Sequence, residues 1–281
     1  MSENEDKGSV VEPVPDADAK AITRVDVMDV YQQLFYNTCR WTAGPLVALA
    51  IRLRCEGAQN VPAEGGALVV ANHRNPVLDP FAMAMKVERP INFVAASVFF
   101  HLPVVSTMYR AWGAISLELE GGEKSKVCLD EAVSLLRDGE LVGMFPEGVH
   151  TIANIRRAHK IRTFRTGFVR IALTAGVPIV PVALIGKGER TLARFPSSMV
   201  KPFFDHPDFA NGAELGYYKR LTIRIGRPLD LSGFQGEPVT SKLIGHVSGK
   251  VRRVVSKLYD GEDLDRFFSG EAPFDISCDR V

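Results

Sequence analysis

The chain has 281 residues, of which 46% are hydrophobic, so it is long enough for one substantial globular domain with extensions, or at most two domains. Its 34 basic and 33 acidic residues give a formal charge of +1, which argues against a nucleic-acid partner recognised through total charge. The four cysteines form no C-x-x-C pair, so neither a zinc site nor a disulfide framework is indicated, and reduced thiols in a cytosolic protein are expected.

The N-terminal part of the chain predicts a tail followed by helices. Residues 1–24 are acidic and lack the segments of a signal peptide, so a disordered tail is expected there. Within residues 25–53, an apolar stripe recurs at helical spacing at Val27, Tyr31, Leu34, Thr38 and Trp41. The apolar segment 41–51 is too short to cross a bilayer, which takes roughly 20 residues. Periodicity alone fits a helix in a membrane interface and equally a helix packed on the domain.

The central part of the chain alternates between strand and helix patterns. Buried strands are predicted at residues 67–71, 91–96, 113–119, 141–145 and 177–185, and a further strand in 221–231. Helices are predicted at residues 80–88, 123–139, 167–176 and 239–259. This order predicts an α/β domain over residues 54–260, with a mostly parallel sheet flanked by helices. Residues 188–218 are rich in Pro, Gly and aromatic residues and are predicted to form a long surface excursion, and residues 261–281 a C-terminal tail.

The first stretch that carries chemistry is Asn72-His73, directly after the 67–71 strand, followed by Asp79-Pro80. Open α/β sheets bind ligands at the carboxyl ends of their strands. Asp79 is explained as the cap of the next helix, with Pro80 in its first turn. It is equally able to accept a hydrogen bond from one nitrogen of His73, so that the other nitrogen takes a proton from a substrate hydroxyl. His73 and Asp79 are therefore the candidate catalytic residues.

The second stretch is Phe145-Pro146-Glu147-Gly148, at the end of the 141–145 strand. Its turn places a carboxylate at the same edge of the sheet as the His73 loop. Taken alone, Glu147 is more typical of a solvated turn residue, and its position opposite the His73 loop favours a functional role.

The third feature is a run of positive charge. Residues 148–188 contain no Asp or Glu but seven basic residues, Arg156, Arg157, Lys160, Arg162, Arg165, Arg170 and Lys187. A solvated basic face is the ordinary explanation, although surfaces commonly mix both signs. A phosphate-bearing ligand or an anionic membrane surface gives the run a physical cause, because charge-assisted hydrogen bonds contribute about 1.5–3 kcal/mol each.

Together these residues resemble the glycerolipid acyltransferase family typified by 1-acylglycerol-3-phosphate acyltransferase. The resemblance covers about residues 50–231 and rests on motifs that occur in order. They are Asn72, His73 and Asp79, then Gly113 and Ile115, then Phe145 to Gly148, then Arg165 and Gly167. The ordered set is far more specific than any one motif, and it implies the α/β fold of glycerol-3-phosphate acyltransferase-like proteins.

The resemblance implies transfer of a fatty acyl group from acyl-CoA or acyl carrier protein to the hydroxyl of 1-acylglycerol 3-phosphate, giving phosphatidate in phospholipid biosynthesis. His73, oriented by Asp79, would be the base, and no metal or redox cofactor would be needed. The acceptor site would comprise Phe145, Pro146, Glu147, Gly148 and Arg165, with Arg156, Arg157 and Arg162 as candidates for binding its phosphate. A peripheral or monotopic position on the cytoplasmic face of a membrane would follow, with residues 25–53 at the interface.

Three positions depart from the family pattern. Five residues separate His73 from Asp79, where four are common. Leu119 stands where the family often has an arginine, and Val149-His150 replace the usual Thr-Arg. Two phosphate contacts are therefore missing. Either basic residues of the 156–165 segment replace them, or the acceptor is another molecule.

Two alternatives follow from these departures. One is acyl transfer to glycerol 3-phosphate, another lysophospholipid or a glycolipid. The other is a non-catalytic lipid- or acyl-CoA-binding protein on the same fold, in which Asp79 only caps a helix. The distance from an Asp79 carboxylate oxygen to His73 Nδ1 separates an enzyme from a binding protein, since about 2.6–3.2 Å favours the enzyme.

Overall fold

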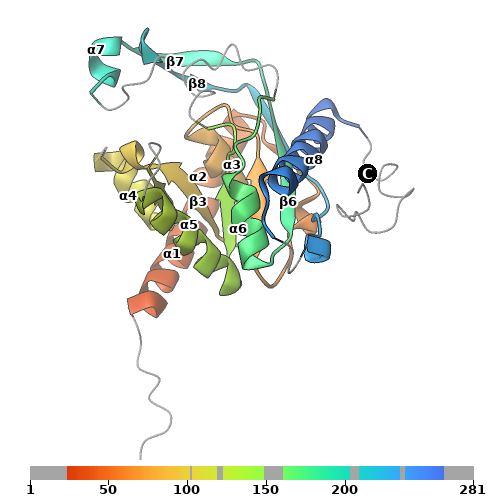
Figure 1. Cartoon of the computed structure of the whole chain (residues 1–281). Helices are drawn as coiled ribbons and strands as arrows, with labels where there is room; N and C mark the ends of the chain where they lie inside the picture. The colour runs from red at the N-terminus through yellow and green to blue at the C-terminus, as the bar shows by residue number, and fades with distance from the viewer. Residues whose placement is uncertain are drawn as a thin grey trace, which may run out of the picture.

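A seven-stranded sheet forms the centre of the protein in the computed structural model, which describes residues 24–101, 103–118, 123–148, 161–202, 209–234 and 238–262 (Figure 1). Its strands are β1 (Arg54–Glu56), β2 (Ala67–Ala71), β3 (Ile91–Ala96), β4 (Ile115–Leu117), β5 (Leu141–Met144), β6 (Ile179–Lys187) and β9 (Arg220–Ile225). They are ordered β1-β9-β6-β2-β5-β3-β4, and every neighbouring pair is parallel except β6 and β9. The predicted α/β fold with a mostly parallel sheet is confirmed.

Helices cover both faces of this sheet. On one face lie α5 (Glu123–Arg137), α6 (Gly167–Ala175) and α8 (Ser241–Asp260), which share a buried core with Leu68 and Val70 of β2. On the other face lie α2 (Ala43–Ala50) and α3 (Leu78–Lys86), which pack around Val69 and Ala71. Because β2 is buried on both sides, its sequence is a continuous apolar run. Helices α1 (Arg24–Trp41) and α4 (Pro103–Ala111) flank α3, and 3-10 turns lie at Ala58–Asn60, Ser97–His101 and Ser232–Phe234.

The predicted element boundaries hold to within a few residues, with some corrections. The predicted ends of α5 and α6 at Gly139 and Gly176 are confirmed, and both glycines have positive φ. The strand expected at 221–231 ends earlier, at Ile225, and Leu229 beyond it forms only an isolated bridge with Ile179. Strand β1 and helix α4 were not predicted. The expected tails at 1–24 and 261–281 lie almost entirely outside the described residues.

Residues 188–218 leave the main sheet as the predicted excursion, and they contain two strands and a helix that were not predicted. They form an arm in which β7 (Arg190–Phe195) pairs antiparallel with β8 (Ala213–Tyr217), with the short helix α7 (Ser197–Val200) beyond them. Figure 1 shows this arm extending past the sheet at the top of the view. The two strands were not predicted because neither has a fully buried face, so the sequence of each has little hydrophobic alternation.

Helix α1 is attached to the domain through polar side chains. The Tyr36 hydroxyl donates to the Ile91 carbonyl at 2.7 Å, and Gln32 donates to Asn92 Oδ1 at 2.9 Å. Arg40 donates to the Ala84 and Val87 carbonyls near the end of α3. The same face of α1 also makes apolar contacts, since Phe35, Tyr36 and Cys39 pack with Met85 and Trp112. The side chains of Val30, Tyr31, Leu34 and Trp41 are exposed instead.

The outer surface of the two N-terminal helices is apolar. Its exposed side chains are Val30, Tyr31, Leu34, Trp41, Leu46 and Leu49, and they are between 50% and 78% exposed. Helix α1 is therefore packed on the domain, as one interpretation of the periodicity predicts, but Tyr31, Leu34 and Trp41 of the stripe face outward. No helix in the described part of the chain is both long enough and apolar enough to span a bilayer.

Gly66, which directly precedes β2, lies close to the backbone of α5, and this contact gives a test of the packing. A Cβ atom at Gly66 would lie 1.9 Å from the carbonyl oxygen of Leu136, a backbone atom that cannot rotate away. We expect Gly66→Ala to lower the free energy of unfolding by about 1–3 kcal/mol in urea denaturation. The control is Gly245→Ala in α8, where an added Cβ meets nothing within 4 Å and helix propensity improves. Equal stability of the two variants would contradict the described packing.

Candidate active site

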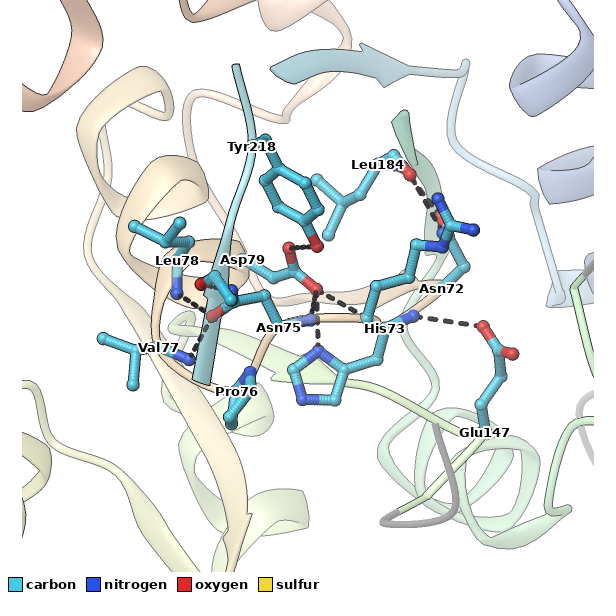
Figure 2. A network of polar contacts seen from close by, with 12 residues as sticks. Asn72, His73, Asn75, Pro76, Val77, Leu78, Asp79, Glu147, Leu184 and Tyr218 are labelled. Atoms are coloured by element: carbon cyan, nitrogen blue, oxygen red, sulfur yellow. Dashed lines mark hydrogen bonds and ion pairs between the residues drawn. The ribbon is translucent and has the colours of Figure 1, made fainter. Parts of the chain in front are cut away.

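His73 and Asp79 form a buried pair at the carboxyl end of β2. The Asp79 Oδ2 atom lies 3.0 Å from His73 Nδ1, and the two residues are 0% and 7% exposed respectively. Because a carboxylate accepts, this contact places the proton of a neutral imidazole on Nδ1. The second ring nitrogen faces away from Asp79 with its lone pair available (Figure 2).

Asp79 is the centre of a larger network. Its Oδ2 atom also accepts from the backbone N–H groups of Arg74 at 2.7 Å and Asn75 at 2.8 Å. Its Oδ1 atom accepts from the Tyr218 hydroxyl at 3.1 Å (Figure 2). A carboxylate without access to water needs such donors, because an unpaired buried charge is strongly destabilising. The four contacts hold the carboxylate in one orientation toward the imidazole.

The five-residue spacing between His73 and Asp79 is accommodated by Asn75. Its Oδ1 atom accepts from the backbone N–H groups of Val77 and Leu78, at 3.1 and 2.9 Å, where α3 begins. Its amide donates to the Gly216 carbonyl of β8 at 2.6 Å. Asn75 therefore caps the helix, and the interpretation of Asp79 as that cap is wrong. Asp79 lies in the first turn of α3 and points back to the loop.

Glu147 joins the second sequence motif to the His73 loop. Its Oε1 atom accepts from the backbone N–H of His73 at 3.0 Å, and its Oε2 atom accepts from that of Arg162 at 2.9 Å. The side chain is 5% exposed, so the description of Glu147 as a solvated turn residue is wrong. Burial raises the pKa of the Glu147 carboxyl, and the two backbone N–H groups partly oppose that rise. Glu147 thus acts as a clamp that positions His73.

An apolar cavity of about 80 Å³ opens beside the histidine ring. Its walls include Phe93, Phe99, Tyr109 and Phe145. The Phe145 ring stacks on His73 with centroids 4.1 Å apart and an angle of 20°. The ring of His73 therefore has a fixed plane as well as a fixed tautomer, and the space beside it suits an apolar chain.

The remaining predicted acceptor residues divide between the cavity and its surroundings. Gly148 lines the cavity, and the Arg165 side chain lies against it, since a Cβ at Gly148 would be 3.2 Å from Arg165 Nε. Pro146 is buried and accepts from the Arg165 backbone N–H at 2.8 Å. The Arg162 side chain is exposed, and only its backbone contacts the site. Arg156 and Arg157, together with Leu119, Val149 and His150, lie outside the described residues.

Comparison with known proteins finds a family that resembles part of the chain. Residues 52–185, just under half of the chain, match the acyltransferase family. An uncharacterised protein of Mycobacterium tuberculosis is 33% identical over 49% of this chain and 38% of its own length. A 1-acyl-sn-glycerol-3-phosphate acyltransferase of Borreliella burgdorferi is 25% identical over 51% of this chain and 53% of its own.

The fold is also that of a solved member of this group. The crystal structure of the 1-acyl-sn-glycerophosphate acyltransferase PlsC from Thermotoga maritima has a TM-score of 0.51 to this chain and is 22% identical, covering 84% of this chain and 80% of that one. The curated relatives are matched over about half of their length or less. The similarity therefore covers the fold and the segment that carries His73 and Glu147, and the activity of the protein is a matter for proposal.

Two polar partners of the His73 loop were missed by sequence reasoning. Tyr218, which lies in the link between β8 and β9, contacts Asp79 across 139 positions of the chain. Arg74 forms a buried ion pair of 2.8 Å with Glu189, just after β6. Tyr218 and Glu189 belong to no recognisable motif, and only the tertiary fold brings them to the His73 loop.

The Tyr218 hydroxyl provides a test of the network around Asp79. Burial and the adjacent Asp79 charge raise the pKa of Tyr218 well above its ordinary value, so the phenol stays protonated and donates. We expect Tyr218→Phe to lower the free energy of unfolding by about 1.5–3 kcal/mol, since a hydrogen bond to a charged group is lost. The neighbouring half-buried Tyr217 supplies the control, and Tyr217→Phe should leave stability unchanged. A Tyr218→Phe variant as stable as this control would contradict the network.

Proposed function

We propose that the protein is a membrane-associated O-acyltransferase that transfers a fatty acyl group from an acyl thioester to the free hydroxyl of 1-acylglycerol 3-phosphate, giving phosphatidate. The single observation that carries the proposal is the 3.0 Å contact between Asp79 and His73 Nδ1, because it leaves the other nitrogen ready to accept a proton. This distance supports an enzyme over a non-catalytic binding protein, for which Asp79 would serve only as a cap.

The chemistry follows from the orientation of the imidazole. The unprotonated nitrogen of His73 takes the proton from the acceptor hydroxyl as its oxygen attacks the thioester carbonyl. The buried Asp79 stabilises the imidazolium that forms. As the tetrahedral intermediate collapses, the C–S bond breaks and the thiolate takes the proton from His73. The products are an ester and a free thiol, and the base returns to its starting state.

The apolar cavity suits the acyl chain of the proposed acceptor, and its rim suits the phosphate. The aromatic walls beside His73 favour an acyl chain, because burial of each CH₂ contributes about 0.8 kcal/mol. Arg165, against Gly148 at the edge of the cavity, is the described cation best placed for the acceptor phosphate. The activity named for the Borreliella burgdorferi relative supports the same acceptor.

The outward apolar stripe of α1 and α2 supports peripheral attachment to a membrane. Six large apolar side chains between Val30 and Leu49 are at least half exposed, and the other side of α1 is occupied by the domain. An amphipathic segment of this kind buries its apolar face at the boundary between lipid headgroups and acyl chains. Such attachment would bring the acyltransferase domain to a lipid acceptor.

The proposal predicts that His73 is essential for turnover. We expect His73→Ala to reduce acceptor-dependent release of thiol from long-chain acyl-CoA by about 10²- to 10⁴-fold. The control is His246→Ala, at an exposed position of α8, which should retain full activity. Circular dichroism would establish that both variants are folded. Full activity in folded His73→Ala would remove this residue as the base.

Membrane attachment predicts a separate effect of the exposed leucines. Replacing both Leu46 and Leu49 by Ser should weaken binding to vesicles of phosphatidylcholine and phosphatidylglycerol by about 10-fold or more, because two buried leucines contribute several kcal/mol. Leu192→Ser is the matched control, since Leu192 is 68% exposed on the β7–β8 arm. Equal vesicle binding by the double variant and the wild type would argue against the interfacial role of α1 and α2.

A further inference from the structure

A polar cleft of about 950 Å³ lies at the edge of the sheet that carries the His73 loop, and no step of the proposed reaction uses it. Its floor is formed by the ends of β1, β6 and β9, and one wall is the last turn of α8, with Tyr259 and Asp260. The volume lies within the range of about 300–1,000 Å³ that is typical of small-molecule sites. We call it the α8 cleft.

Three cations of the α8 cleft are left without a protein partner. Arg54, Lys187 and Arg220 are exposed, and within the described part of the chain their side chains form no ion pair or hydrogen bond. The other charges of the lining are largely compensated. Arg224 pairs with Glu56 at 2.7 Å, and Glu189 pairs with Arg74 at 2.8 Å. Of the three carboxylates that line the cleft, Asp260 is the one left to balance the charge of the three cations.

The strand register places these cations on one face of the sheet. Lys187 of β6 lies directly opposite Arg220 of β9 in an antiparallel pair, so their side chains project to the same side. Arg54 of β1 lies opposite Thr222, two residues beyond Arg220 and therefore on that side as well. Like charges directly opposite one another destabilise a sheet. A polyanionic ligand would remove this cost.

The α8 cleft is continuous with the catalytic loop. Glu189, which lines the cleft, accepts from Arg74 Nη1, and Arg74 directly follows His73. The Arg74 guanidinium also lies 5.9 Å from the centre of the Tyr259 ring, on the opposite wall of the cleft. A ligand in the α8 cleft would thus begin beside the loop that holds the base and extend away from it along the sheet edge.

We propose that the α8 cleft binds the nucleotide phosphates of a coenzyme A thioester, so that acyl-CoA is the acyl donor. This inference rests on the proposed acyl transfer, and it deepens that function by naming the donor. Lys187, Arg220 and Arg54 would contact the phosphates, and Tyr259 would supply an aromatic wall of the kind that stacks on a base. The concave shape favours a nucleotide over the broad docking surface of a carrier protein.

Binding without turnover tests the α8 cleft directly. Isothermal titration of the full chain with coenzyme A and with pantetheine, which lacks the nucleotide, should show binding that depends on the phosphates. Lys187→Gln and Arg220→Gln should each weaken coenzyme A binding about 10-fold, the loss expected for one charge-assisted contact. Arg253→Gln, at an exposed position of α8 outside the cleft, is the control and should bind coenzyme A as the wild type does.

A kinetic measurement distinguishes failure of the cleft proposal from failure of the proposed reaction. The preference of the wild type for palmitoyl-CoA over S-palmitoyl-pantetheine, measured as a ratio of kcat/KM, should fall about 10-fold in each cleft variant. If neither substitution weakens coenzyme A binding, the assignment of the α8 cleft as the coenzyme A site is overturned, while the proposed acyl transfer is unaffected. A second outcome is that the wild type shows no acyltransferase activity but its coenzyme A binding is weakened by the two substitutions. That result would support the α8 cleft as a coenzyme A site and refute the proposed function. The assignment of the donor would be overturned if the substitutions weakened binding of inorganic phosphate as much as binding of coenzyme A, and if palmitoyl-CoA and S-palmitoyl-pantetheine were equally good donors. The cleft would then be a simple anion site.

Discussion

The buried carboxylate of Asp79 is the interaction on which the site depends. It has no solvent exposure, and its two oxygens accept from His73 Nδ1, two backbone N–H groups and the Tyr218 hydroxyl. These donors come from the loop after β2 and from the link between β8 and β9, so one charge joins two distant parts of the chain. Because an unpaired buried carboxylate is costly, the loop, the first turn of α3 and the β8 link are stable only together. The orientation of the imidazole is a consequence of that requirement.

The parts of the fold that the sequence predicts are those determined by local pattern. β2 is recognisable because both of its faces are buried, and α5 and α6 end at glycines with positive φ. The pairing of His73 with Asp79 was expected from the motif, although the five-residue spacing was not explained by it. The explanation is Asn75, whose side chain caps α3 and reaches β8. Such contacts depend on tertiary structure, and a residue such as Tyr218 carries no local signal of its role.

The basic run of residues 148–188 shows why charge in sequence does not translate directly into a patch. Arg162 and Arg165 lie next to the Glu147 turn, whereas Lys187 lies at the end of β6. In the α8 cleft, Lys187 is joined by Arg54 and Arg220, which lie outside the run. The fold thus separates the described residues of one basic segment and assembles a second cationic group from three strands. Both lie at the same edge of the sheet as the histidine, and the apolar helices α1 and α2 give the domain a separate outward surface.

The protonation of the His73 ring tests the central claim most directly. Nitrogen chemical shifts of labelled His73, measured by NMR at neutral pH, distinguish a proton on Nδ1 from a proton on Nε2. The contact with Asp79 predicts the Nδ1–H tautomer in the wild type, and loss of that preference in Asp79→Asn. If wild-type His73 carries its proton on Nε2, the nitrogen that should accept the hydroxyl proton is already protonated, and the account of His73 as the base is contradicted.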